Sequence, residues 1–190
     1  TGVSLTPANY FEPAQLLITA KPNVKVVLIP YFYAASAGAL EEVACNLRGL
    51  FAQRGVLAIL LPLKEIAEAK ERIIPFMNRV DTIMCLAGDA IADINDVLVK
   101  LCNQYGVTLF AKDIESVRSG AALGYGVEAS AIGEKVMHMA DAIIHKQVHA
   151  GRIAVEFVDG DSILVINKKA SAMQGLSPTP QLLSHAVEVG

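Results

Sequence analysis

Five short apolar runs, each followed by a turn and a stretch with helical periodicity, constrain this chain more than any other feature. They span residues 24–29, 56–61, 82–86, 107–111 and 122–126. Runs that are continuously apolar, rather than alternating, are typical of strands buried on both faces of a parallel sheet. We therefore predict an α/β fold: a flavodoxin-like, parallel five-stranded sheet with helices on both faces. Ligands of such sheets collect at the carboxyl ends of the strands.

The segments between the runs carry helix signals. Apolar residues at helical spacing predict helices over residues 9–20, 64–78, 91–105, 114–118 and 129–146, and another that ends before Gly55. Asp113 stands where the helix over 114–118 needs an N-cap. In the helix over 129–146 we expect an inward-facing stripe of Ile132, Val136, Met139 and Ile143.

The pattern changes near residue 151. Strand-like runs at 153–158 and 163–166 flank Asp159-Gly160-Asp161, which predicts a hairpin. A small helix over 169–174 and a terminal helix over 181–187 follow. We expect residues 1–150 to form an α/β ligand-binding lobe, and residues 151–190 a crossover with a C-terminal hairpin and helical extension.

Composition excludes several classes of protein. The chain has 190 residues, of which 53% are hydrophobic, so it can bury a sizeable core. No apolar stretch approaches the roughly 20 residues that span a bilayer. A net charge of −3 gives no reason to expect a nucleic-acid partner. Cys45, Cys85 and Cys102 form no close pair, and their apolar surroundings predict buried free thiols.

The order of residues from Phe110 onward resembles a known family. The resemblance rests on Thr1-Gly2-Val3-Ser4, Phe110-Ala111-Lys112-Asp113, Ser116-Val117, Gly120, Gly126, Gly133, the run 164–170, Gly175-Leu176, Pro180, Leu182-Leu183 and Ala186. In this order they resemble the substrate-binding components of ABC importers of the tryptophan or tyrosine uptake type. The resemblance covers nearly the whole chain.

This resemblance implies one lobe of a type I periplasmic-binding-protein fold, in which two α/β lobes joined by a hinge clamp a small molecule. It also implies an ABC transporter permease as partner and a periplasmic or extracellular, membrane-associated location. In such proteins a whole lobe precedes the Thr-Gly-Val-Ser segment, so we expect this chain to be the second lobe plus the hinge return. An unpaired lobe should expose an apolar patch near the strand ends or under the terminal helix, and should tend to self-associate.

Candidate ligand-binding residues follow the predicted strands. They are Tyr31, Tyr33 and Ser36 after the first, Gly88 and Asp89 after the third, Lys112 and Asp113 after the fourth, and Glu128 after the fifth. Aromatic faces, hydroxyls and helix N-termini suit an amino-acid-like ligand. Gly88 stands where the family tends to place an Asp. For Asp89 and Asp113 an N-cap role alone would explain the residue, and for Glu128 a first-turn acid is the better interpretation.

Signals for chemistry are weak. His145 and His149 are four residues apart, but no carboxylate or cysteine accompanies them at ligand spacing, so solvated histidines are the better interpretation than a metal site. The sequence has no phosphate loop and no evident nucleophile with its base, so we expect neither a cofactor nor catalysis. A stand-alone, flavodoxin-like regulatory effector-binding domain or enzyme remains the alternative, because fold alone does not decide function.

Overall fold

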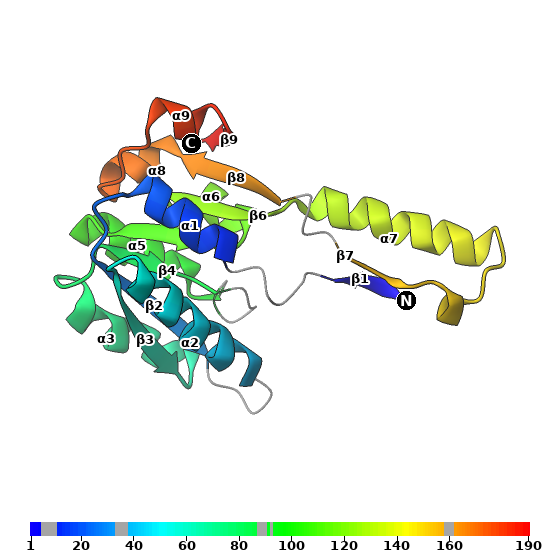
Figure 1. Ribbon diagram of the computed structural model, residues 1–190, viewed down its shortest axis with the longest axis horizontal. Helices are drawn as coiled ribbons and strands as arrows, with labels where there is room; N and C mark the ends of the chain where they lie inside the picture. Colours follow the sequence, from blue (N-terminus) through cyan, green and yellow to red (C-terminus); the bar gives the residue numbers. More distant parts are fainter. Residues whose placement is uncertain (5–10, 33–37, 87–90, 92, 158–161) are drawn as a thin grey trace.

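A seven-stranded sheet forms the centre of the protein, with strand order β3-β2-β4-β5-β6-β8-β9 (Figure 1). A computed structural model of the chain describes residues 1–4, 11–32, 38–86, 91, 93–157 and 162–190. The strands of this sheet are β2 (Val26–Phe32), β3 (Leu57–Leu63), β4 (Thr82–Met84), β5 (Thr108–Ala111), β6 (Leu123–Val127), β8 (Ser162–Asn167) and β9 (Ala186–Val189).

The five predicted parallel strands are confirmed. The strands β3, β2, β4, β5 and β6 pair with one another in parallel, and each overlaps one of the five apolar runs. Counted within these five, the order is second, first, third, fourth, fifth, which is the flavodoxin-like order. Burial explains the pattern, since all three residues of β4 and all four of β5 are buried.

Helices cover both faces of the sheet. One face packs against α1 (Phe11–Ala20), α2 (Gly38–Gln53) and α9 (Pro180–Leu183), with Phe51 and Phe110 deep in that core. The other face packs against α3 (Ala69–Ile73), α5 (Asn95–Tyr105) and α6 (Ile114–Arg118). The sheet therefore separates two apolar cores, as expected for strands that are buried on both sides.

Several buried polar groups are hydrogen-bonded at the amino ends of β4 and β5, although the buried Thr82 hydroxyl has no partner. Lys21 donates to the backbone oxygen of Asp81 at 2.7 Å and to the Thr108 hydroxyl at 2.9 Å, and that hydroxyl donates to the backbone oxygen of Gln174. Burial lowers the pKa of Lys21, while the nearby Asp81 carboxylate raises it. The side chain of Gln174, fully buried, accepts from Leu109 and donates to Gly120. These bonds tie α8 (Lys168–Met173) and its following turn to the sheet.

An arm projects from the opposite end of the sheet (Figure 1). We use this name for β1 (Gly2–Ser4), α7 (Ala129–Ile144), η3 (Ala150–Arg152) and β7 (Val155–Phe157). Strands β1 and β7 pair in parallel as a separate two-stranded sheet. The remaining described elements, which we call the lobe, lie in residues 11–127 and 162–190. The boundary expected at residue 150 falls within the arm.

Two predictions for the C-terminal region are wrong. The runs near residues 155 and 163 do not pair as a hairpin, because β7 pairs with β1 while β8 pairs antiparallel with β6. The terminal helix is also shorter than predicted: α9 ends at Leu183, and Ala186–Val189 form strand β9 beside β8. The C-terminal region thus extends the main sheet by two strands.

Three further predictions need correction. The Cys45 thiol belongs to an exposed residue, although Cys85 and Cys102 are buried as predicted. Residues 64–78 form no single helix: η1 (Ile66–Glu68), α3 and η2 (Ile74–Phe76) follow one another, and Pro75 lies in the last of them. Of the predicted inward stripe of α7, Met139 is buried but Val136 is 48% exposed, since the arm offers only two short strands to pack against.

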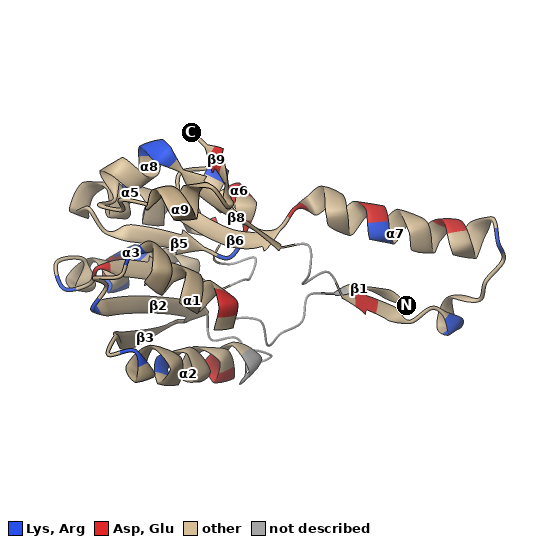
Figure 2. Cartoon of the chain, turned by 45° about the horizontal axis from the view of Figure 1, so that its top comes forward, with Lys and Arg blue, Asp and Glu red and all other residues tan. Residues whose placement is uncertain are grey.

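Charged residues of both signs occur on the lobe and on the arm (Figure 2). The arm also exposes large apolar side chains, which include Val136, Met137, Ile144, Val155 and Phe157. No helix in the described part of the chain is both long and apolar enough to cross a membrane.

Candidate functional site

The carboxyl ends of the five parallel strands define one edge of the sheet, and we call it the carboxyl edge. Parallel pairing from β3 to β6 makes every loop that follows these strands emerge there. Lys112 and Asp113 follow β5, and Glu128 follows β6, the strand beside it. The arm projects from the same edge (Figure 1). Three of the predicted site residues are therefore brought to adjacent strand ends.

Asp113 caps helix α6, as its position in the sequence predicts. Its carboxylate accepts from the Ser116 backbone N–H at 2.7 Å through Oδ1 and from the Ser116 hydroxyl at 2.8 Å through Oδ2. Each carboxylate oxygen has a second lone pair. The carboxylate is thus held in a fixed orientation, on an exposed residue, with capacity for further donors.

Gly126 allows the Lys112–Asp113 segment to lie against β6. A Cβ atom at Gly126 would stand 2.9 Å from the Lys112 backbone oxygen and 3.4 Å from the Cα of Asp113. Gly124 is similarly close to the Ala111 backbone oxygen, at 2.9 Å. Side chains at these positions would displace the segment that carries two candidate residues. Glycines inside a strand signal such close approaches, and this signal was available in the sequence.

Glu128 is joined to helix α6 through Arg118. The Arg118 guanidinium donates to Glu128 at 3.1 Å and to Glu115 at 2.5 Å, so it links α6 to the first residue beyond β6. Glu128 occupies the N-cap position of α7 and makes no side-chain capping bond there. All three side chains are substantially exposed, so their mutual attraction is screened by water. No local pattern in the sequence singles out Arg118.

Among the candidates that the structure describes, Tyr31 has the least surface available to a ligand. It is the sixth of seven residues in β2, and its side chain belongs to the core that β2 shares with α1 and α2. The remaining candidates Tyr33, Ser36, Gly88 and Asp89 lie outside the described residues.

The interpretation that no carboxylate accompanies His145 and His149, which follow α7, is wrong for His145. Asp141 lies 2.9 Å from Nδ1 of His145 and 3.2 Å from Nζ of Lys146. Hydrogen bonding to His145, followed by Lys146, lowers the pKa of Asp141. The described residues nevertheless contain no group of three or more metal-binding side chains.

Solved structures share this fold along the whole chain. A conserved domain protein from Vibrio cholerae aligns over 100% of this chain and 62% of its own, with 23% identity and a TM-score of 0.86. An ABC domain in complex with L-Trp from Streptococcus pneumonia aligns over 100% of this chain and 64% of its own, with 19% identity and a TM-score of 0.82. An open, ligand-free substrate-binding protein with adhesive properties from Clostridium difficile aligns over 95% of this chain and 59% of its own, with 15% identity and a TM-score of 0.70.

These identities establish the fold alone, and this chain spans less than two thirds of the length of the three proteins. No curated protein matches the sequence. The family comparison is decisive, because residues 1–190 match the family described as ABC transporter substrate binding protein. The resemblance of residue order is thereby confirmed, and the chain belongs to the ABC transporter substrate-binding protein family.

Proposed function

We propose that this chain is the ligand-binding part of an ABC importer's substrate-binding component, and that it holds an amino-acid-like molecule at the carboxyl edge. The observation that carries this proposal is the convergence of Lys112, Asp113 and Glu128 at adjacent strand ends in a member of a substrate-binding family. In sheets of this kind, ligands bind outside the carboxyl ends of the strands. The family match also favours transport over the regulatory or enzymatic alternative.

The charges at the edge suit a zwitterion. Lys112 is a half-buried lysine that directly precedes Asp113, an exposed residue with an oriented carboxylate. A ligand's carboxylate would approach the first and its amino group the second, each gaining a charge-assisted hydrogen bond. Tyr33, Ser36, Gly88 and Asp89 are proposed to complete the site from the segments after β2 and β4. A related protein was solved in complex with L-Trp, which makes an aromatic amino acid the first ligand to test.

The proposed mechanism is closure of two lobes around the ligand. In it, the arm belongs to a second α/β lobe, and Glu128 stands where the chain passes from β6 of the lobe to α7 of the arm. Contacts made only when the lobes meet would stabilise the closed form. A permease would then recognise that closed form at the outer surface of the membrane. The role needs no catalytic group and no cofactor.

Calorimetric titration tests the ligand. We expect L-tryptophan or L-tyrosine to bind this chain weakly, because one lobe leaves half of the ligand exposed, with dissociation constants in the range of about 0.1–1 mM. Binding below about 1 μM by the isolated chain would contradict the two-lobe mechanism. Absence of binding by any amino acid, sugar or small peptide would contradict the carboxyl-edge site itself.

A pair of lysine variants locates the contact. We expect Lys112→Ala to weaken amino-acid binding by about tenfold, the effect of losing one charge-assisted hydrogen bond. Lys100→Ala is the matched control, since Lys100 is exposed on α5 and away from the strand ends. Equal affinities for the two variants would remove Lys112 from the site.

Self-association follows from the exposed apolar side chains of the arm. Met137 and Ile144 are 72% and 68% exposed, and all three residues of β7 are exposed. Surfaces of this kind usually contact another protein surface. Light scattering after size exclusion should show dimers that grow with concentration, and Met137→Lys should reduce them. A strictly monomeric chain at high concentration would contradict this expectation.

A further inference from the structure

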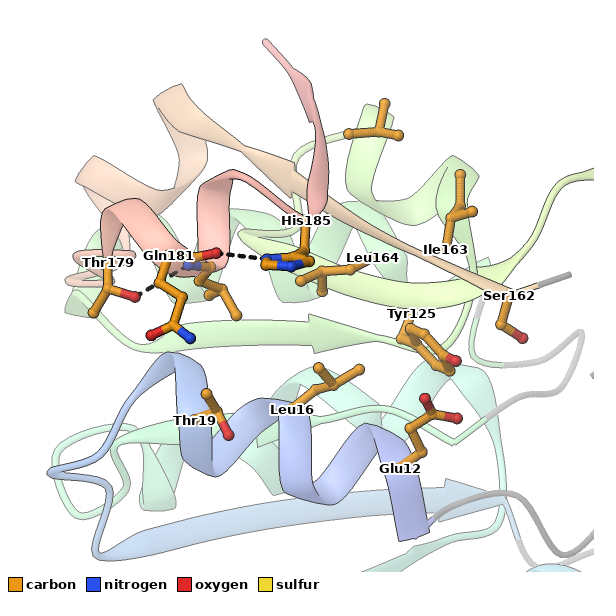
Figure 3. A pocket seen from close by; sticks show the side chains of 12 residues that line it. Glu12, Leu16, Thr19, Tyr125, Ser162, Ile163, Leu164, Thr179, Gln181 and His185 are labelled. Carbon is orange, nitrogen blue, oxygen red and sulfur yellow. Dashed lines mark hydrogen bonds between the residues drawn. The ribbon is translucent and has the colours of Figure 1, made fainter. Parts of the chain in front are cut away.

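A groove between α1 and α9 lies on one face of the sheet, over β6 and β8 (Figure 3). Ser162, which pairs with Val127 at the carboxyl end of β6, lines one end of it. Its volume is about 540 Å³, which is within the range of small-molecule sites. Glu12, Leu16 and Thr19 of α1 line one wall at helical spacing, and Leu182 of α9 lines the other. Leu164 forms part of the floor, so the middle of the groove is apolar.

Three oxygen-bearing side chains gather at one end of this groove. Tyr125, Glu12 and Ser162 all line this end, and Figure 3 shows the Glu12 carboxylate beside the Tyr125 side chain. Burial, together with the Glu12 contact, raises the pKa of Tyr125 to about 12. The hydroxyl therefore stays protonated at neutral pH, and Glu12 keeps acceptor capacity toward the groove.

The described residues that line the groove include one carboxylate, Glu12, and neither lysine nor arginine. His185 also lines it, with its Nδ1 at 2.9 Å from the Gln181 backbone oxygen. A ligand's carboxylate would find neither lysine nor arginine among these residues, whereas an ammonium group could donate to Glu12 and to the neighbouring hydroxyl oxygens. The opposite end carries Thr19, Thr179 and Gln181, about 10 Å away along the seven-residue spacing from Glu12 to Thr19. Those groups suit a neutral polar tail.

We propose that this groove is a second ligand site, separate from the carboxyl edge, and that it binds a primary amine with an apolar body. The ammonium group lies at Glu12 and Tyr125, the body lies along Leu16 and Leu164, and a hydroxyl at the far end reaches Gln181 or Thr179. An amine without a carboxylate is preferred, which is the opposite preference to that of a zwitterion site.

Three probes of one skeleton test the proposal by amide-resolved NMR titration of the full chain. Tyramine carries the ammonium group, 4-ethylphenol lacks it, and L-tyrosine adds a carboxylate. We expect tyramine to shift the amides of Leu164, Leu182 and His185, with an affinity about tenfold above that of the other two at these residues. Shifts of the Lys112 and Asp113 amides by L-tyrosine indicate binding at the carboxyl edge. The proposal for the groove and the proposal for the carboxyl edge are therefore tested independently.

Glu12→Gln is the decisive variant, and Glu134→Gln on α7 is its matched control. Both glutamates are exposed, so neither change should disturb folding. We expect Glu12→Gln to weaken tyramine binding by about tenfold and to leave 4-ethylphenol unchanged. Equal effects of the two variants, equal binding of tyramine and 4-ethylphenol, or no shift of groove residues by tyramine would each overturn the proposal.

Discussion

The lobe and the arm are built from similar residues but differ in how much they bury. In the lobe, each face of the sheet has its own core, and β4 and β5 are buried along their entire lengths. In the arm, Met139 is the one buried residue of the sixteen in α7, and β7 is exposed throughout. Folding free energy comes mainly from apolar burial, so the lobe should carry the stability of this chain. The arm leaves large apolar side chains exposed to solvent.

Matched isoleucine truncations should show this contrast most strongly. Ile83 in β4 is 0% exposed, while Ile144 at the end of α7 is 68% exposed. We expect Ile83→Ala to lower the free energy of unfolding by about 3–4 kcal/mol, because it removes buried methyl groups and leaves a cavity. Ile144→Ala should change it by less than about 0.5 kcal/mol. Urea denaturation measures both, and comparable losses would refute the contrast.

A buried amide and an exposed carboxylate give the next comparison. Gln174→Ala removes a side chain that bonds Leu109 and Gly120 inside the lobe, and we expect a loss of about 2–3 kcal/mol as those groups lose their partner. Asp141→Asn breaks the exposed pairs with His145 and Lys146 in the arm. Its denaturation midpoint should not move. If the arm variant were the more damaging of the two, the arm would be contributing stability that its burial does not explain.

Replacing glycine by alanine should destabilise the lobe and stabilise the arm. A Cβ at Gly126 would meet the Lys112 backbone oxygen at 2.9 Å, so Gly126→Ala should destabilise by about 1–2 kcal/mol and weaken amino-acid binding. Gly133 lies within α7 with nothing within 4 Å of such an atom, and Gly133→Ala should stabilise the helix by up to about 1 kcal/mol. Thermal denaturation and helicity by circular dichroism distinguish them. Tolerance of alanine at Gly126 would show that the loop does not depend on this close approach.

Removing side chains at helix N-caps should give the smallest difference in the free energy of unfolding. Asp113→Ala removes the side-chain cap of α6, at a cost of about 1 kcal/mol. Glu128→Ala affects an N-cap position that has no side-chain cap, so it should cost less than about 0.5 kcal/mol. Both are read from urea denaturation, with Asp113→Asn, which can still cap, as the rescue variant. A larger loss from Glu128→Ala would mean that its contact with Arg118 matters more than its exposure allows.

Local signals in the sequence predict most of the lobe. Continuous apolar runs locate the five parallel strands, and Asp113 is predicted as an N-cap from position alone. Local signals do not predict which strands pair with one another. The Asp159-Gly160-Asp161 signal predicts a turn between neighbours, whereas β7 pairs with β1 at the other end of the chain, and no local pattern encodes that. Val136 has helical spacing toward a core that the arm does not provide.

The candidate site residues follow the same division. The rule that ligands meet strand ends predicts Lys112, Asp113 and Glu128 as candidates, because the rule needs only the strand directions. Arg118 is not found, because its contact with Glu128 depends on how α6 sits beside β6. The α1–α9 groove is also missed, since it joins segments that lie more than 100 residues apart in sequence, such as Glu12 and Tyr125.

An amide-resolved NMR titration of this chain with L-tryptophan tests the central claim most directly, because it reports where a ligand binds even when binding is weak. Recognition at the carboxyl edge predicts the largest shifts at Lys112, Asp113 and Glu128, with Lys21 and Gln174 at the opposite edge unchanged. Shifts confined to the opposite edge or to the α1–α9 groove, or none up to about 10 mM ligand, would contradict it.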